Sequence, residues 1–359
     1  MSLVYNRTPL IHQFFPGRKS MPQFFLKWEC FQPSGSFKSR GIGNLILKNA
    51  IRISRAGKKR AEVFASSGGN AGLAAATAAR RLSLPCTVVV PTATKVKMIE
   101  KIKETGAKVI VNGAYWKEAD QFLKNTIMNN IDKDKVEPIY AHPFDNPDIW
   151  EGHSSMVDEI VEDMKAQKIA LDRVKAIVCS VGGGGLYNGI IQGLERYGLA
   201  SKIPIVGVET KGSHVFNTSL REGSPVEFAK PSSIATSLCT ANISTEAFKN
   251  AIKYGTKSLV VDDIDVLETC LRFTHARNVV TEPACGAAVH IGYHPELLEQ
   301  ALGKSLSEDD VVVIIACGGS SNTVSDMEDL LAKLKSEKTL SDLQHFYQPQ
   351  PSIENVKLL

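Results

Sequence analysis

Short apolar strands alternate with helical patterns along most of this 359-residue chain, and this alternation restricts the fold more than any other feature. The segment 311–316, VVVIIA, is apolar without a break, and 86–90, CTVVV, nearly so. Such runs are typical of strands buried on both faces of a parallel sheet. Strands separated by helices therefore predict an α/β fold with parallel, doubly wound sheets covered on both faces.

The same patterns set bounds for individual elements. Strands are expected at 24–29, 62–66, 86–90, 108–111, 138–141, 176–181, 203–208, 258–261 and 311–316, and helices at 70–82, 95–105, 115–128, 149–164, 186–197 and 264–275. Gly106 is expected to end one of these helices.

The chain is long enough for two lobes. We place a large domain at residues 1–41 and 144–335 and a small domain at 42–143. The polar segment 336–359, which contains two prolines, is predicted to be a C-terminal tail.

The composition of the chain limits the kinds of binding partner that we expect. A net charge of +4, from 42 basic and 38 acidic residues, gives no reason to expect nucleic acid or an anionic membrane. No apolar run reaches membrane-spanning length. Seven scattered cysteines without a CxxC motif indicate a reducing compartment and no clustered zinc ligands.

The N-terminal composition leaves the compartment open. No acidic residue precedes Glu29, whereas four basic ones do, which resembles a mitochondrial targeting signal. However, the segment 8–10 and the strand from Phe24 have the pattern of folded protein. We predict the cytoplasm, with the mitochondrial matrix as the alternative. The basic residues are Arg7, Arg18, Lys19 and Lys27.

The stretch 33–41, PSGSFKSRG, joins a predicted strand to a predicted helix. Ser36 is suited to cap that helix, so Lys38 would lie in its first turn. The positive end of the helix dipole disfavours a cation there and should lower the pKa of Lys38. A neutral amine is what a Schiff-base lysine must be. For this peptide alone, a solvent-facing loop lysine is the alternative.

Four glycines, Gly182–Gly185, follow the strand at 176–181 and precede a helix. Backbone N–H groups in such a loop bind anions, so we predict a phosphate site rather than a structural turn. A dinucleotide is the alternative, because the next strand leads to Glu209, where a ribose-binding acid would lie. Against it, GGGGLYNG does not match G-x-G-x-x-G and lies far from the first strand–helix turn.

Two further strand ends carry small and polar residues. The segment 66–72, SSGGNAG, offers hydroxyls, an amide and backbone N–H groups to a substrate carboxylate. Helix capping by Ser67 or Asn70 is the alternative. Cys317 ends the last strand, either as a small core residue or as a thiol facing a ligand. Since ligands bind beyond the carboxyl ends of parallel strands, all four strand ends should converge on one crevice.

PSGSFKSRG, SSGGNAG, GGGG and CGGSSN, in this order, resemble the motifs of the fold type II pyridoxal-5′-phosphate (PLP) enzymes, which are similar in fold to the tryptophan synthase β subunit. The resemblance covers about Thr8 to about Leu334. Within this family the chain is most similar to the catabolic L-serine/L-threonine dehydratases (ammonia-lyases), the fungal ones in particular. Such a member would convert serine to pyruvate and threonine to 2-oxobutanoate, each with ammonia.

The resemblance also implies site residues. Lys38 would bind PLP covalently and serve as the base, and either the cofactor phosphate or Ser67 would supply the proton that the leaving hydroxide needs. Phe37 would stack on the ring, Asn70 would bind its hydroxyl, and Cys317 would face its nitrogen. The cofactor set comprises Lys38, Phe37, Asn70, Gly182, Gly183, Gly184, Gly185, Leu186, Ser237 and Cys317; the substrate set comprises Ser67, Gly68, Asn70 and Ala71; Glu209 and Ser213 lie where relatives bind a monovalent cation such as K+.

A carboxylate partner would keep the ring nitrogen protonated, so that the ring withdraws electron density strongly. A thiol cannot do so as well, which favours β-elimination over racemisation or transamination. The alternatives within the fold are serine racemase, threonine synthase and cysteine synthase. Outside it, a dinucleotide-dependent oxidoreductase and a cofactor-binding protein without turnover are also considered. The partners implied are a small amino-acid substrate and a second copy in a homodimer.

Overall fold

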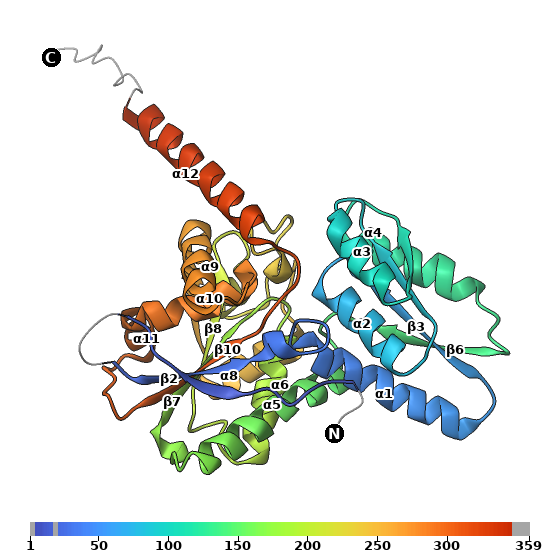
Figure 1. Ribbon diagram of the computed structural model, residues 1–359, viewed down its shortest axis with the longest axis horizontal. Coiled ribbons are helices and arrows are strands. Elements are labelled where there is room, and N and C mark those ends of the chain that lie inside the picture. Colours follow the sequence, from blue (N-terminus) through green and yellow to red (C-terminus); the bar gives the residue numbers. More distant parts are fainter. Residues whose placement is uncertain (1–3, 17–20, 347–359) are drawn as a thin grey trace, which may run out of the picture.

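The structure, a computed structural model, describes residues 4–16 and 21–346 and contains two sheets with separate hydrophobic cores (Figure 1). The larger sheet has the strand order β1-β2-β10-β7-β8-β9. Its strands are β1 (Leu10–Gln13), β2 (Gln23–Trp28), β7 (Val174–Ser180), β8 (Ile205–Thr210), β9 (Lys257–Val261) and β10 (Val311–Ala316).

All neighbours in the larger sheet are parallel except β1, which pairs antiparallel with β2. The prediction of parallel sheets is therefore wrong for this edge strand. β1 and β2 are close in sequence, whereas a parallel connection would need a long crossover. At the centre, β10 lies between β2 and β7, and its six residues are all buried, as its unbroken apolar run predicts.

The smaller sheet is parallel, in the order β5-β4-β3-β6. Side chains of β3 alternate between two cores: Val63 and Ala65 join the cluster formed with α1 and α2, while Phe64 joins another that contains Ala119 and Leu123. Both faces are thus covered, as predicted. The strands are β3 (Arg60–Ser66), β4 (Cys86–Val90), β5 (Lys108–Val111) and β6 (Val136–Ala141).

The helices cover the sheets and link the two units. α10 packs on β7, β8 and β10, while α1 packs on β3, β6 and α5. Figure 1 shows α9 and α10 above the large sheet in that view and α5 and α6 below it. The helices are α1 (Lys38–Ala56), α2 (Asn70–Arg81), α3 (Val96–Glu104), α4 (Trp116–Phe122), α5 (Pro147–Ala166), α6 (Gly185–Arg196), α7 (Val215–Glu222), α8 (Thr245–Tyr254), α9 (Asp263–Arg277), α10 (Pro283–Tyr293), α11 (Pro295–Leu302) and α12 (Val324–Phe346).

Most predicted bounds lie within two residues of the observed ones, and three expectations need a correction. The helix predicted for 115–128 is α-helical only to Phe122 and continues as a π turn and a 3-10 turn. Thr105 caps α3, and Gly106 follows it with a left-handed φ of 90°. α12 runs through Ser336, where the tail was predicted to begin, and extends away from the body (Figure 1). Residues 347–359 of that tail lie outside the described residues.

The two sheets draw on residues 10–28 with 174–316 and on residues 60–141, respectively. The domain boundaries at 41/42 and 143/144 stay predictions. None of the helices in the described ranges has both the length and the hydropathy needed to cross a membrane.

Candidate active site

The loops after β2 and β10 are joined by backbone pairing. The Phe37 N–H donates to the Cys317 carbonyl at 3.0 Å, and the Gly319 N–H donates to the Gly35 carbonyl at 2.9 Å. Ser36 forms a β-bridge with Gly318. Because β2 and β10 are parallel neighbours, both loops leave the same edge of the sheet. The predicted convergence of these two segments is confirmed.

Ser36 does not cap α1, so that prediction is wrong. The N-cap is Phe37, whose backbone is already helical (φ −50°, ψ −22°). The bridge to Gly318 holds Ser36 in an extended conformation instead, and its buried hydroxyl has no hydrogen-bond partner in the described part of the chain.

Lys38 is the first residue of α1. Its Nζ donates to the Pro143 carbonyl oxygen at 2.8 Å and lies 5.1 Å from the centroid of the Phe37 ring. Burial lowers the pKa of Lys38 to about 8, although electrostatic interactions with Cys317 and Glu282 act to raise it. The alternative of a solvent-facing loop lysine is therefore wrong. The main cause of the low pKa of Lys38 is burial.

Phe37 packs against His153 of α5, with ring centroids 4.9 Å apart. His153 is fully buried, and its Nδ1 lacks a hydrogen-bond partner within the described ranges. Burial lowers its pKa well below the usual value, and the charges of Lys38 and Arg40 act in the same direction. His153 is thus a neutral packing partner behind Phe37.

Asn70 connects the small unit to the large one. It is the first residue of α2, and its Nδ2 donates to Glu282 Oε1 at 2.7 Å and to Ser237 Oγ at 3.3 Å. Its Oδ1 accepts from the Ser320 N–H at 3.0 Å. The side chain does not cap α2, whose N-cap is Gly69.

Glu282 is buried at the N-terminus of α10 and also accepts hydrogen bonds from Ser321. Gly319 has no room for a side chain, because a Cβ there would lie 1.9 Å from Glu282 Cδ. The carboxylate is thus held between Asn70 and the loop after β10.

The segment 66–72 supplies the remaining predicted substrate contacts. Ser67 Oγ accepts from the Gly69 N–H at 3.2 Å, which places this hydroxyl in the turn before α2. At Gly68, a Cβ would lie 2.2 Å from Thr94 Oγ1. Ala71 is buried in the first turn of α2, where the first N–H groups have no partner within the helix.

The tetraglycine loop leads from β7 into α6 and is tightly packed. Gly184 is the N-cap of α6 with a φ of 91°, and a Cβ there would lie 2.5 Å from the Ala247 Cβ. A Cβ on Gly183 would meet the Phe144 ring at 2.4 Å, and one on Gly185 would meet the Phe144 carbonyl at 2.7 Å. Leu186, in the first turn, is buried. The neighbouring groups leave no room for side chains on Gly183, Gly184 and Gly185, so these residues present only their backbone.

Two consecutive residues connect Lys38 to the glycine loop. Pro143 accepts the hydrogen bond of the lysine, and Phe144 packs against Gly183 and Gly185. The amine and the glycine loop therefore contact two consecutive residues, whose Cα atoms are about 3.8 Å apart.

The thiol of Cys317 lies at the carboxyl end of β10 and is buried. A hydrogen-bonding contact with Cys285 and burial both raise the pKa of Cys317 well above its usual value. The thiol is therefore protonated. Ser237 adjoins Gly182, where a Cβ would lie 3.3 Å from the Ser237 carbonyl oxygen.

Glu209 and Ser213 lie at the end of β8. Glu209 is fully buried and accepts from the N–H groups of Phe216 and Asn217 at 2.9 and 2.7 Å. Burial raises its pKa to about 8 in spite of these hydrogen bonds. The buried Ser213 hydroxyl has no hydrogen-bond partner among the described residues. Within those same residues, no group of three or more His, Cys, Asp or Glu side chains is arranged to hold a metal ion.

Four contributors to the site were not identified in the sequence: Pro143, Phe144, Glu282 and Cys285. Glu282 precedes Pro283, a pair that signals a helix start but not contact with Asn70, 212 residues away. Pro143 and Phe144 act through a carbonyl oxygen and a packing surface, for which no motif exists.

A family model described as "Pyridoxal-phosphate dependent enzyme" matches residues 1–318. The chain belongs to this family. Its fold type II architecture, with parallel sheets in two units, agrees with the prediction, and its cofactor is pyridoxal phosphate.

Comparisons with individual proteins support the assignment of the chain to this family. The chain is 66% identical over 359 residues, 99% of each protein, to a catabolic L-serine/threonine dehydratase of Saccharomyces cerevisiae. It is 37% identical over 312 residues, 86% of each, to an L-serine dehydratase of Dictyostelium discoideum. The crystal structure of a fungal L-serine ammonia-lyase from Rhizomucor miehei matches with a TM-score of 0.76 and 28% identity, covering 91% of this chain and 98% of that one.

The residues present fit the cofactor of the family. An amine with a pKa of about 8 at Lys38 suits an aldehyde, and a loop without side chains at the N-terminus of α6 suits a phosphate. The Asn70 amide and the protonated Cys317 thiol supply neutral hydrogen-bonding groups for the ring.

Proposed function

We propose that this protein is an L-serine/L-threonine ammonia-lyase that converts serine to pyruvate and threonine to 2-oxobutanoate, with release of ammonia. The observation that carries the proposal is the partly buried Lys38 amine, connected through Pro143 and Phe144 to the tetraglycine loop. The 66% identity to the yeast dehydratase over nearly the whole of both chains supports this choice of reaction.

PLP, when bound, withdraws electron density from the substrate's α-carbon and so makes its proton acidic. Lys38 would hold the cofactor and accept this proton at Nζ, since a pKa of about 8 leaves a useful fraction neutral at physiological pH. Asn70, clamped by Glu282 and Ser320, would orient the ring. Gly182–Gly185 and Leu186 would bind the phosphate.

The segment 67–71 would bind the substrate carboxylate through its hydroxyl and backbone N–H groups, and Ser67 would supply a proton to the leaving hydroxyl. Cys317, protonated and buried, would donate its S–H toward the ring nitrogen. A neutral ring nitrogen withdraws electron density weakly, which favours loss of the β-hydroxyl over racemisation.

The test is to incubate the purified holoenzyme with L-serine alone and to measure pyruvate, ammonia and D-serine. We expect pyruvate and ammonia in equal amounts, with little D-serine. D-serine as the main product would instead support a racemase, and absence of turnover without a second nucleophile would support a synthase.

We also propose a monovalent cation such as K+ between Glu209 and Ser213. Two observations support it. The Glu209 carboxylate is buried in surroundings that raise its pKa, and the Ser213 hydroxyl has no hydrogen-bond partner among the described residues. A cation there would compensate the charge and accept the hydroxyl oxygen as a ligand.

This cation predicts a specific pH dependence. Without it, folded Glu209 keeps its proton up to about pH 8 while the unfolded chain releases it near 4.5, so the free energy of unfolding falls as pH rises through this window. We expect K+ in place of tetramethylammonium to raise Tm at pH 8 and much less at pH 6. At 100 times its Kd, a bound ion adds about 2.7 kcal/mol.

The Glu209→Gln variant should lose both the K+ effect and most of this pH dependence, whereas Glu222→Gln, at an exposed site, should keep them. Equal Tm values in K+ and tetramethylammonium at pH 8 would contradict the cation site.

The assembly, compartment and pathway are further proposals. A homodimer is inferred from the family resemblance alone, and light scattering would test it. The cytoplasm is favoured over the mitochondrial matrix, because Arg7 and Lys27, two of the basic N-terminal residues, form ion pairs within the fold; Arg18 and Lys19 lie outside the described residues. Production of pyruvate would place the reaction in amino-acid catabolism that feeds gluconeogenesis.

A further inference from the structure

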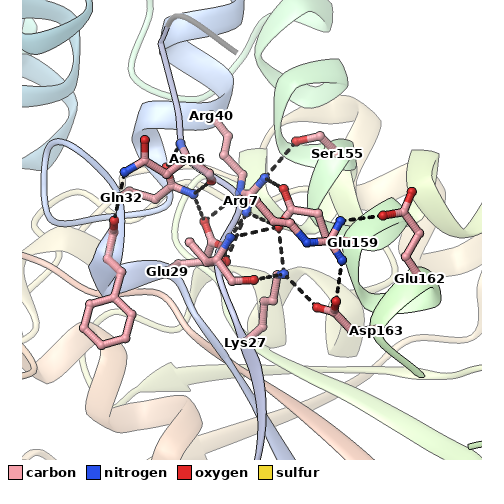
Figure 2. A network of polar contacts seen from close by, with 12 residues as sticks. Asn6, Arg7, Lys27, Glu29, Gln32, Arg40, Ser155, Glu159, Glu162 and Asp163 are labelled. Carbon is pink, nitrogen blue, oxygen red and sulfur yellow. Dashed lines mark hydrogen bonds and ion pairs between the residues drawn. The ribbon is translucent and has the colours of Figure 1, made fainter. Parts of the chain in front are cut away.

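A buried cluster of charged side chains lies beside the Lys38 loop and takes no part in the chemistry described above (Figure 2). We call it the Arg40 cluster; its members are Arg40 of α1, Glu29 directly after β2, Glu159 of α5, Lys27 of β2 and Thr8. Arg40 is two residues beyond Lys38 in the first turn of α1 and is completely buried.

Arg40 makes two bidentate ion pairs. Its Nε and Nη2 donate to the two oxygens of Glu29 at 2.7 and 2.8 Å, and its Nη1 and Nη2 donate to the two oxygens of Glu159, both at 2.7 Å. Ser155 Oγ and Thr8 Oγ1 accept further bonds at 3.1 Å. Acceptors thus surround the whole donor edge of the guanidinium, a geometry that a lysine ammonium cannot reproduce.

Lys27 forms an ion pair with Glu159, the second carboxylate of the cluster. Its fully buried Nζ lies 2.7 Å from Glu159 Oε2 and donates to the Thr8 carbonyl at 2.6 Å. Burial acts to raise the pKa of Glu159, but the hydrogen bonds and charge of Arg40 and then of Lys27 outweigh it and lower that pKa. Within the Arg40 cluster two cations therefore face two carboxylates, and Lys27 also lies 3.7 Å from Asp163 Oδ2.

The Glu29–Arg40 pair closes the loop that carries the lysine. Glu29 lies where β2 ends and Arg40 where α1 begins, so the pair joins the two ends of residues 30–39. The Glu159 pair ties the same helical turn to α5. There the backbones touch, because a Cβ on Gly152 would lie 2.4 Å from the Arg40 carbonyl oxygen.

Buried ion pairs contribute little net stability compared with apolar packing, so stability alone is a weak reason for this arrangement. We propose that Arg40 is a positioning residue, which holds the Lys38 amine in register with Pro143 and the tetraglycine loop by fixing both ends of the lysine loop. The inference rests on the proposed role of Lys38.

The test compares Arg40→Lys with Arg52→Lys, the same substitution on the same helix at an exposed pair with Glu137. In Arg40→Lys we expect faster amide hydrogen exchange of residues 30–41 in the apoprotein. In the holoenzyme we expect kcat for L-serine to fall about 100-fold, the scale of an ångström-sized misplacement, with KM changed little. Arg52→Lys should match the wild type in all three measurements.

An Arg40→Lys protein that binds PLP fully, turns over at the wild-type rate and shows wild-type exchange at 30–41 would overturn the proposal. A loss of activity explained wholly by a smaller folded fraction would do the same. Where Arg40→Lys does not fold, Glu29→Gln takes its place under the same criteria, because it keeps the Glu159 pair and weakens the pair that closes the loop by removing its charge and one acceptor oxygen.

Failure of the proposed function can be told apart from failure of this inference. If the wild type releases no pyruvate from serine, the proposed reaction is wrong, while the exchange comparison still tests whether Arg40 holds the loop.

Discussion

The Lys38→Ala variant should lose essentially all turnover of L-serine and the visible absorption of bound PLP. In the proposed function its amine both holds the cofactor and accepts the α-proton, and no other described lysine amine is hydrogen-bonded to Pro143. A positioned base alone contributes about 10²–10⁴-fold to a rate, so we expect kcat to fall by at least about 10³-fold. Pyruvate release and the absorption spectrum of the purified protein are the measurements.

A matched control is Lys58→Ala, which removes an exposed lysine just beyond the C-terminal end of α1. It should keep the wild-type spectrum and rate. If Lys38→Ala retained full cofactor absorption and released ammonia normally, the assignment of Lys38 would be wrong, and with it the proposed mechanism.

Gly184→Ala is expected to have the second largest effect, on PLP binding. Gly184 has a φ of 91°, which an L side chain rarely adopts, and its added Cβ would lie 2.5 Å from the Ala247 Cβ in α8. Backbone strain and overpacking each cost about 1–3 kcal/mol, so the turn must shift and move the N–H groups that we propose bind the phosphate. We expect PLP affinity to fall by at least about tenfold, since 1.4 kcal/mol is one factor of ten. Titration of the apoprotein with PLP measures it.

The Gly198→Ala variant separates the effect of backbone strain from the effect of overpacking against Ala247. Gly198 also has a positive φ, 63°, but a Cβ there would meet nothing within 4 Å. Its substitution should lower Tm through backbone strain and leave PLP affinity unchanged. If Gly184→Ala behaved in the same way as Gly198→Ala, the tetraglycine loop would not be the phosphate site.

The motifs could be predicted from the sequence because their signals are local. Apolar runs predicted β4 and β10, and the small and polar residues that follow β2, β3, β7 and β10 predicted a shared ligand crevice. Local signals misled at one helix start: Ser36 has good capping chemistry, but its backbone pairs with Gly318 and its hydroxyl does not cap α1. At Asn70, where capping was only the alternative, the side chain bonds to Glu282 instead. Capping preference is worth only about 1 kcal/mol, which such contacts outweigh.

The sequence by itself determined the α/β class, the order of the four loops that we propose bind ligands, and the lysine that opens α1. Periodicity and the residues that follow each strand are properties of short segments. Only the tertiary structure decided which buried polar and charged groups pair with one another. Glu282 meets Asn70 across 212 residues, Arg40 meets Glu159 across 119, and Lys38 meets the Pro143 carbonyl across 105. The physical reason is that burial and charge pairing depend on distance in space, which no local pattern records.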